Sequence, residues 1–281
     1  MTTGEQDGSV GTDATKQRVR EQYSSVGDAY VRSVGHATGS DLGRMVELAD
    51  PQPMDVLLDL ATGGGHVARV FAPLVASVVA SDLTPEILAH AETYLTGLGL
   101  MNIRYETVDA ETIPHADDTF DIVTCRIAPH HFPNPGRFVS EVARVLKPGG
   151  RFVLVDNTVP EGDAGAFFNR FEKLRDPSHV ESLTAAAWQG LISDQEMTLI
   201  AVETLTKRHD FDDWVTRSGV SAGTRAELER MLLEAGPELR DMFDVRAGDG
   251  ESQPITGFSD TKTLFVALAR GNRHSLILPA E

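Results

Sequence analysis

Short apolar runs alternate with helical patterns through the middle of the chain. Each run carries apolar side chains on both faces, which is typical of strands buried within a parallel sheet. Helical spacing at 66–75, 85–96 and 135–146 separates several of them. The alternation predicts a doubly wound α/β core with a parallel sheet and right-handed crossovers. The runs predicted as strands are VLLDLA (56–61), VVASD (78–82), IRYETVD (103–109), FDIVTCR (120–126) and RFVLVD (151–156).

The segment before this core has a different pattern. Residues 1–14 are small and polar without periodicity, so we predict a disordered tail there. Residues 15–50 carry apolar side chains three and four positions apart, from Val19 to Val34. This spacing predicts a helical lid that packs on the core at 51–160.

Beyond the core, residues 161–281 combine helical and strand-like stretches. The strand-like stretches at 197–211 and 263–270 are expected to pair at the edge of the sheet, and the helical ones to form a cap. Phe167 and Phe171 fall on one face of a cap helix. Such a face belongs either to the core or to a substrate pocket.

Composition narrows the class of protein. The chain has 281 residues, a formal net charge of −17 and one cysteine, Cys125. The charge disfavours nucleic-acid binding, since KQRVR (16–20) is too small a basic patch to hold a phosphate backbone. The lone cysteine excludes an intrachain disulfide and a cysteine-rich zinc site. No signal peptide and no apolar stretch of about 18 residues is present, so we expect a cytoplasmic protein that neither spans a membrane nor is exported.

A glycine-rich loop joins the first predicted strand to the helix that follows. Glycines allow a tight turn and bring backbone N–H groups close to a ligand, at the sheet edge where doubly wound proteins bind their ligands. The loop is therefore a candidate binding site, although a plain strand-to-helix turn stays open. It reads Asp59-Leu60-Ala61-Thr62-Gly63-Gly64-Gly65-His66.

Three carboxylates follow the same edge. Asp59 lies near the end of a buried strand, where either loop amides or a ligand ammonium must satisfy its charge. Asp82 ends the second strand and can accept hydrogen bonds from ribose hydroxyls, or cap a helix. Asp109 ends the third strand, where it can accept the exocyclic amine of adenine while Ala110 lines the base. Together they describe one site for an amine, a ribose and an adenine.

The motifs resemble those of class I S-adenosylmethionine-dependent methyltransferases, in the bacterial small-molecule branch of the ubiquinone and menaquinone C-methyltransferases. The resemblance covers about residues 45–157 and includes the glycine loop, the three acids and Leu146-Lys147-Pro148-Gly149-Gly150. It implies a Rossmann-like, seven-stranded sheet that ends in an antiparallel hairpin, and S-adenosyl-L-methionine as cofactor. Ala61 departs from the family, which usually has a glycine there; the added methyl group should leave binding intact. The resemblance implies cofactor-binding roles for Asp59, Ala61, Gly63, Gly65, Asp82, Leu83, Asp109, Ala110 and Arg126.

The same loop has rival interpretations. Gly63 to Ala68 also satisfies G-x-G-x-x-G/A, and Asp82 lies near the spacing used for the ribose of a nicotinamide cofactor, so an NAD(P)-dependent oxidoreductase is the main alternative. Asp59 argues against it because a carboxylate would repel a pyrophosphate. A protein that binds the cofactor or S-adenosylhomocysteine without turnover remains a further alternative.

The residues after the fourth strand are candidates for the chemistry. His130 and His131 follow Arg126 and could deprotonate an acceptor, since the histidine pKa lies near neutrality. Asp156-Asn157 resembles the magnesium-binding pair of catechol-type methyltransferases, but the positive charge of Arg126 would oppose a divalent cation. We therefore expect a metal-independent methyltransferase that acts on carbon or oxygen of a small molecule. An apolar helical face leaves a homodimer open.

Overall fold

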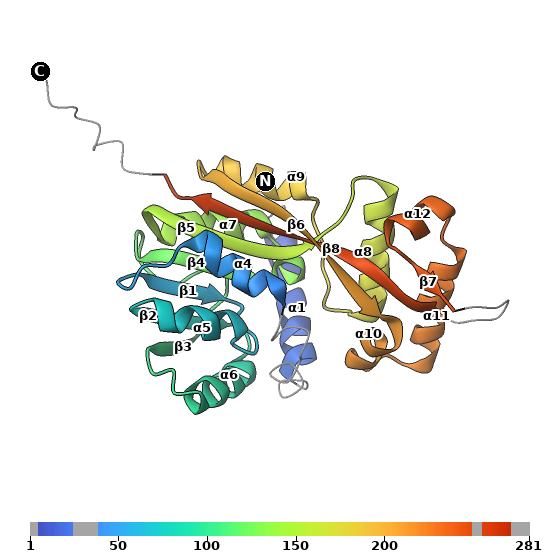
Figure 1. Ribbon diagram of the computed structural model, residues 1–281, viewed down its shortest axis with the longest axis horizontal. Coiled ribbons are helices and arrows are strands. Elements are labelled where there is room, and N and C mark those ends of the chain that lie inside the picture. Colours follow the sequence, from blue (N-terminus) through green and yellow to red (C-terminus); the bar gives the residue numbers. More distant parts are fainter. Residues whose placement is uncertain (1–4, 25–38, 249–254, 271–281) are drawn as a thin grey trace, which may run out of the picture.

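The computed structural model of the chain describes residues 5–24, 39–248 and 255–270. Its centre is an eight-stranded sheet of order β3-β2-β1-β4-β5-β8-β6, with β7 paired to β8 off this path (Figure 1). The first five strands are parallel, and β8 is antiparallel to both β5 and β6. This confirms the doubly wound α/β fold with antiparallel strands at the C-terminus, and the short β7 adds an eighth strand to the seven that were expected. The strands are β1 (Val56–Leu60), β2 (Ser77–Asp82), β3 (Ile103–Thr107), β4 (Phe120–Arg126), β5 (Leu146–Thr158), β6 (Thr198–Asp210), β7 (Arg246–Ala247) and β8 (Ile255–Leu268).

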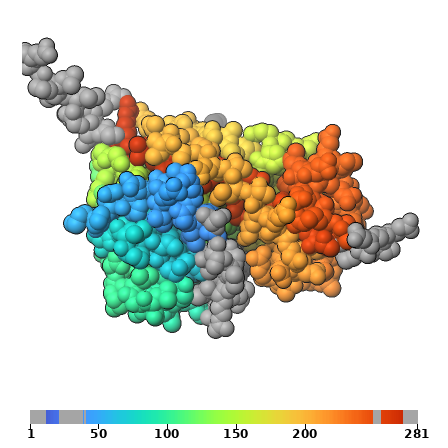
Figure 2. All heavy atoms as spheres, viewed as in Figure 1, coloured from blue at the N-terminus to red at the C-terminus, as the bar shows by residue number. Residues whose placement is uncertain are grey.

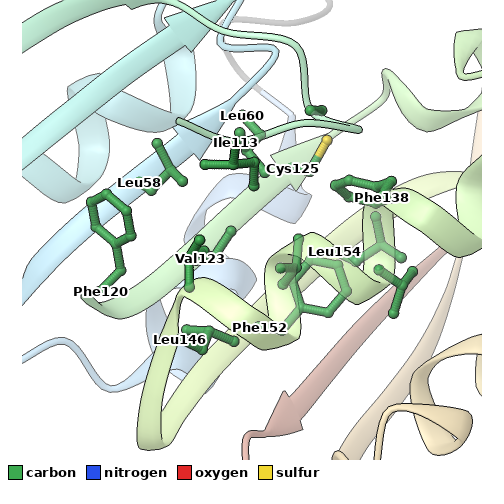
Figure 3. Packing of buried hydrophobic residues seen from close by; sticks show 14 of the residues in the cluster. Leu58, Leu60, Ile113, Phe120, Val123, Cys125, Phe138, Leu146, Phe152 and Leu154 are labelled. Atoms are coloured by element: carbon green, nitrogen blue, oxygen red, sulfur yellow. The ribbon is translucent and has the colours of Figure 1, made fainter. Parts of the chain in front are cut away.

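Helices cover both faces of the sheet because its strands are apolar on both sides. On β1, Leu58 points into one buried cluster with α7 and α9, whereas Leu57 points into another with α4 and α5. Figure 3 shows the first cluster, in which Phe138 of α7 packs beside Phe152 of β5. The helices are α1 (Glu5–Ser24), α4 (Ser40–Ala49), α5 (His66–Phe71), α6 (Pro85–Gly97), α7 (Pro135–Val145), α8 (Asp163–Arg175), α9 (Ala185–Asp194), α10 (Phe211–Arg217), α11 (Ala222–Glu234) and α12 (Pro237–Met242), with short 3-10 turns η1 (Ala72–Leu74) and η2 (Pro129–His131).

A second lobe is built on the far ends of β6 and β8. Both strands continue past the edge of the core, and α8, α10, α11 and α12 gather around their ends (Figure 1). In the space-filling view the second lobe, in orange, stands beside the blue to green core (Figure 2). Its own aromatic core includes Phe167, Phe168 and Phe171, and Phe171 stacks on Trp214 at 4.9 Å. These phenylalanines are therefore core residues of the lobe.

The N-terminal segment differs from the prediction. Residues 5–14, expected within a disordered tail, belong to α1. The physical reason lies farther along the helix, where Lys16 is anchored on the core by two carboxylates. Extending an anchored helix by one residue costs far less than starting one. Residues 1–4 lie outside the described ranges, as does most of the predicted lid between α1 and α4.

The cap also differs in detail. The sequence analysis did not divide the cap into individual helices, whereas the structure has α8 and α9 as separate helices joined by a loop over 176–184. In that loop, Asp176 accepts hydrogen bonds from Ser178, which turns the chain back toward η2. Within the described ranges, no helix is both long and apolar enough to cross a membrane.

Candidate active site

A pocket opens at the carboxyl ends of β1, β2, β3 and β4, and we call it the strand-tip pocket. It encloses about 770 Å³ of space, part of it open to solvent. Apolar side chains such as Ile87 and Val108 form much of its wall. The predicted site residues that line it are Ala61, Gly63, Asp82, Leu83, Asp109, Ala110 and His131.

A second pocket of about 450 Å³ adjoins it and shares Ala61, Gly63 and Ile127 with it. Asp59 and Arg126 line this second pocket. Of the predicted site residues, only Gly65 and His130 line neither pocket. The structure thus brings most of the predicted residues into one connected space.

Two non-glycine residues at the junction of the two pockets have a left-handed backbone conformation. Ala61 has a φ of 51° and Ile127 a φ of 53°. For a β-branched residue this conformation is a true outlier, and each such residue costs about 1–3 kcal/mol. The Ile127 N–H donates to the Val155 carbonyl at 2.7 Å, which holds the strained turn in place. Strain of this kind gathers at binding sites, and the sequence alone gave no sign of it at Ile127.

Gly65 shapes the loop from behind. Its φ is 77°, and a Cβ built there would lie 2.7 Å from Leu95 Cδ1 of α6. Only glycine satisfies both the left-handed backbone and this close approach. Gly65 therefore positions the loop against α6 and does not face the pocket.

Asp59 is buried and its carboxylate is satisfied within the protein. Thr62 Oγ1 donates to Asp59 Oδ2 at 2.5 Å, and Thr124 Oγ1 donates to Asp59 Oδ1 at 2.7 Å. Burial raises the pKa of Asp59 to about 6, although both hydroxyls favour the ionised form. Two threonine hydroxyls thus satisfy the Asp59 carboxylate, whereas the sequence analysis expected loop amides or a ligand ammonium.

Asp82 fastens the end of β2 to the glycine loop. Its Oδ2 accepts from the Gly63 N–H at 3.1 Å and its Oδ1 accepts from the Thr84 N–H at 3.0 Å. Burial raises the pKa of Asp82, while these amides oppose the shift. The side chain still lines the strand-tip pocket, so the carboxylate both holds the loop and faces a ligand.

Asp109 meets a residue that the sequence analysis did not assign to the site. Lys16 Nζ of α1 lies 2.7 Å from Asp109 Oδ2 and 2.6 Å from Glu111 Oε2. The Glu111 N–H donates to Asp109 Oδ1 at 2.9 Å. Lys16 and Val19 also line the pocket, so α1 forms one of its walls. Only the tertiary fold brings α1 to this acid, which is why the local pattern missed it.

Arg126 is held by a buried ion pair. Its Nε lies 2.5 Å from Asp41 Oδ2 and its Nη2 lies 3.0 Å from Asp41 Oδ1, in a bidentate arrangement. The guanidinium lowers the pKa of Asp41 against the opposing effect of burial. The pair joins α4 to the end of β4 and places a fixed positive charge beside the pocket that Asp59 lines.

The two predicted catalytic histidines have different surroundings. His130 Nδ1 lies 2.6 Å from Asp156 Oδ1, and this carboxylate raises the pKa of His130 in spite of its burial. His131 lines the strand-tip pocket, and burial together with the neighbouring His130 lowers its pKa. The two rings lie 4.2 Å apart. The Asp156 carboxylate therefore favours the protonated form of His130, whereas His131 stays neutral near pH 7.

A third histidine completes what we call the histidine cluster: His130, His131 and His179 with Asp156, Asp176 and Ser178. The His179 ring lies 5.5 Å from that of His130, and its Nε2 contacts Asn169 Oδ1 at 2.8 Å. Burial and the nearby charge on His130 lower the pKa of His179. No group of three or more His, Cys, Asp or Glu among the described residues has the arrangement of a metal site.

Comparisons with known proteins agree with the geometry. The sequence profile of the family described as "Methyltransferase domain" matches residues 58–154. The uncharacterized methyltransferase YcgJ of Bacillus subtilis is 35% identical over 83% of this chain and 92% of its own length. The solved structure of a Bacillus halodurans protein assigned to the methyltransferases is 40% identical and covers 83% of this chain and 100% of its own, with a TM-score of 0.79.

A more distant relative lies in quinone biosynthesis. The ubiquinone/menaquinone biosynthesis C-methyltransferase UbiE of Hydrogenovibrio crunogenus is 33% identical over 40% of this chain and 45% of its own length. The family match at residues 58–154 spans the glycine loop and the carboxyl ends of β1, β2, β3 and β4, and it favours the methyltransferase over the nicotinamide alternative. The chain belongs to the class I S-adenosylmethionine-dependent methyltransferases.

Proposed function

We propose that the protein transfers a methyl group from S-adenosylmethionine to an oxygen or carbon atom of a small-molecule acceptor, without a metal ion. The observation that carries this proposal is the strand-tip pocket itself, in which carboxylates from two strand ends and a neutral histidine share one cavity. When bound, the cofactor supplies an electrophilic methyl group on a sulfonium sulfur. Its positive charge suits a site rich in carboxylates.

The lining residues fit the parts of this cofactor. Val108, Ala110 and Ile87 form apolar walls suited to a flat adenine, and Asp109 supplies an acceptor for its amine. Asp82 and Leu83 would hold the ribose. The adjoining pocket, with Asp59 and the loop glycines, would hold the amino-acid tail. Arg126 would stand beside its carboxylate as a cation already fixed by Asp41.

His131 is the proposed catalytic base. Ser178 Oγ donates to Asp176 Oδ1 at 2.5 Å, so its lone pair is available to accept from His131 Nδ1, which lies 3.2 Å away. That bond selects the tautomer whose Nε2 carries the lone pair. A hydroxyl oxygen becomes a strong acid as it is alkylated, so a histidine of lowered pKa can still accept its proton. His131 would therefore take the proton of the acceptor late in the transfer.

His130 acts in this proposal as a positioning residue. Its hydrogen bond to Asp156 fixes the ring and favours its protonated form, whose charge adds to burial in lowering the pKa of His131. The Val180 and Glu181 N–H groups both donate to the His130 carbonyl, at 2.9 and 3.1 Å. The turn η2 is thereby tied to the loop before α9, which keeps His131 aimed into the pocket.

Calorimetry with S-adenosylhomocysteine and with NADH tests the proposal. We expect the first ligand to bind and the second to give no heat of binding. Binding of NADH alone would contradict the cofactor assignment. Once S-adenosylhomocysteine binds, a screen of phenols and activated carbon acids with radiolabelled cofactor would identify the acceptor, and full activity in the presence of EDTA is expected.

A further inference from the structure

Lys16 joins α1 to two acids of the strand-tip pocket that differ in burial. Its Nζ lies 2.7 Å from Asp109 Oδ2 and 2.6 Å from Glu111 Oε2. The Asp109 side chain is 31% exposed, whereas that of Glu111 is only 3% exposed. Burial opposes the charge on Lys16, but its hydrogen bonds to the two carboxylates outweigh burial and raise its pKa. One charged ammonium is therefore shared between a half-buried acid and a buried one.

Asp109 is the acid that can exchange this partner for the cofactor. It lines the pocket, and in the proposed function its carboxylate accepts the adenine amine. Its Oδ1 already accepts from the Glu111 N–H at 2.9 Å, and its Oδ2 is the oxygen that Lys16 contacts. An adenine amine that binds Oδ2 therefore takes the place of Lys16 on Asp109.

Glu111 is fixed in place and keeps a need for a cation. Its Oε1 accepts from the Asn134 N–H at 2.6 Å, and Arg137 Nε donates to its carbonyl oxygen at 2.7 Å. Both contacts hold Glu111 where it is when a ligand enters the pocket. A buried carboxylate that loses its counter-ion is strongly unfavourable. The Lys16 ammonium should therefore remain on Glu111 after it leaves Asp109.

This pair also connects two parts of the pocket wall. Lys16 and Val19 bring α1 to the pocket, and α1 lies beside α6 (Figure 1). Asn134, which donates to Glu111, directly follows Phe132 and Pro133, and both of these line the same pocket. A retained contact between Lys16 and Glu111 thus ties α1 to the segment before α7.

We propose that Glu111 retains Lys16 when the adenine amine takes Asp109, so that α1 stays docked beside the bound cofactor. The inference rests on the proposed function and makes Glu111 a positioning residue of the cofactor site. An ammonium that loses one of two carboxylates stays paired, whereas one that loses its only carboxylate becomes an uncompensated charge. Glu111 therefore lowers the cost of the exchange at Asp109.

A double-variant cycle in calorimetry with S-adenosylhomocysteine tests this role. Glu111→Gln keeps an oxygen that can accept from the Asn134 N–H but removes the charge that holds Lys16. We expect Glu111→Gln to weaken binding by about 5-fold or more in the parent chain, and by less than about 2-fold when Lys16→Met is also present. The matched control is Glu172→Gln, because Glu172 is equally buried and pairs with Arg175 but lines neither pocket.

Hydrogen exchange of the α1 amides gives a second, independent measurement. Saturating S-adenosylhomocysteine should leave the protection of α1 unchanged or raised in the parent chain, because Lys16 stays on Glu111. In Glu111→Gln the same ligand should lower the protection of α1, since Lys16 then has neither acid. A purely structural role of Glu111 would change the protection of α1 equally with and without the ligand.

The remaining outcomes overturn the proposal. Equal affinity in Glu111→Gln and the parent, or an equal loss with and without Lys16→Met, would show that Glu111 does not act through Lys16. A loss of α1 protection when the parent chain binds the ligand would show that α1 is released. Binding of S-adenosylhomocysteine to the parent chain is measured first, so failure of the proposed function is detected separately from failure of this inference.

Discussion

The strand-tip pocket and the histidine cluster are neighbours, but the chain assembles them in different ways. In the pocket, Asp59 and Asp82 each accept one hydrogen bond from the glycine loop, from Thr62 Oγ1 and from the Gly63 N–H, and a second from outside it. The histidine cluster collects His131, Asp156 and Ser178 from three separate segments. In any parallel sheet the carboxyl ends of the strands lie at the same edge, so the pocket follows from the fold. The histidine cluster depends in addition on the path of the loop over 176–184, which returns to η2. The pocket should therefore tolerate a lost side chain better than the cluster does.

Loss of Asp156 should give the largest effect on stability. Asp156→Ala removes the counter-ion of the buried His130, which then either carries an unpaired charge or gives up its proton, at a cost of up to about 3–5 kcal/mol. The measurement is the free energy of unfolding in urea at pH 6, below the ordinary pKa of a histidine. The double variant His130→Ala/Asp156→Ala should cost less than the sum of the single changes because no orphaned charge remains. A cost below about 1 kcal/mol would show that the pair is not a structural unit.

Acid should destabilise the histidine cluster through His179. Burial lowers the pKa of this residue in the folded protein, so the unfolded chain binds more protons below its own pKa of about 6.5. Stability should fall as the pH drops below about 6.5, by up to about 1.4 kcal/mol per pH unit for this group. The contribution of His130 to the pH dependence of stability has the opposite sign. Because its pKa is raised in the folded protein, it stabilises the fold at low pH, and this stabilisation is lost as the pH rises through the pKa of the folded state.

Urea unfolding between pH 4.5 and 7.5 checks this sign. His179→Gln keeps a donor for Asn169 and should flatten the acid side of the profile. Equal slopes in His179→Gln and the parent would show that His179 does not resist protonation.

Loss of Asp82 should weaken the strand-tip pocket without unfolding it. Asp82→Ala removes acceptors from the proposed ribose site and frees the Gly63 and Thr84 amides. We expect affinity for S-adenosylhomocysteine to fall by about 1–3 kcal/mol in calorimetry. Asp194→Ala, at the exposed end of α9, removes the same charge and should leave affinity unchanged. Unchanged affinity in Asp82→Ala would mean that the ribose lies elsewhere.

The contrast between the two regions also explains what the sequence could predict. The parallel strands and the acids at their ends follow from apolar runs and from the rule that strand ends share an edge, so Asp82 and Asp109 were found with their pocket. His131 was a candidate because it follows a strand end. Asp156 was considered only as a metal ligand, because its partner His130 lies 26 positions away along the chain and comes from another segment.

Other features had no local signal at all. The left-handed backbone of Ile127 is imposed by its hydrogen bond to β5, which no propensity anticipates. The cap helices were expected. That they form a lobe with its own aromatic core depends on how far β6 and β8 extend past the other strands of the sheet.

The smallest expected effect concerns the contact between α1 and the pocket. Lys16 occupies Asp109 Oδ2, the same acceptor that an adenine amine would use, so the two compete. Lys16→Met should tighten S-adenosylhomocysteine binding by up to about 1 kcal/mol because the Lys16–Asp109 pair is only partly buried, and the gain should shrink as salt screens the pair. Calorimetry at low and high ionic strength measures it, with Lys147→Met as the control for a lost lysine. Weaker binding in Lys16→Met would instead mean that Lys16 contacts the bound adenine. In that case α1 would form a wall of the pocket in the complex, and Lys16 would not compete with the adenine for Asp109.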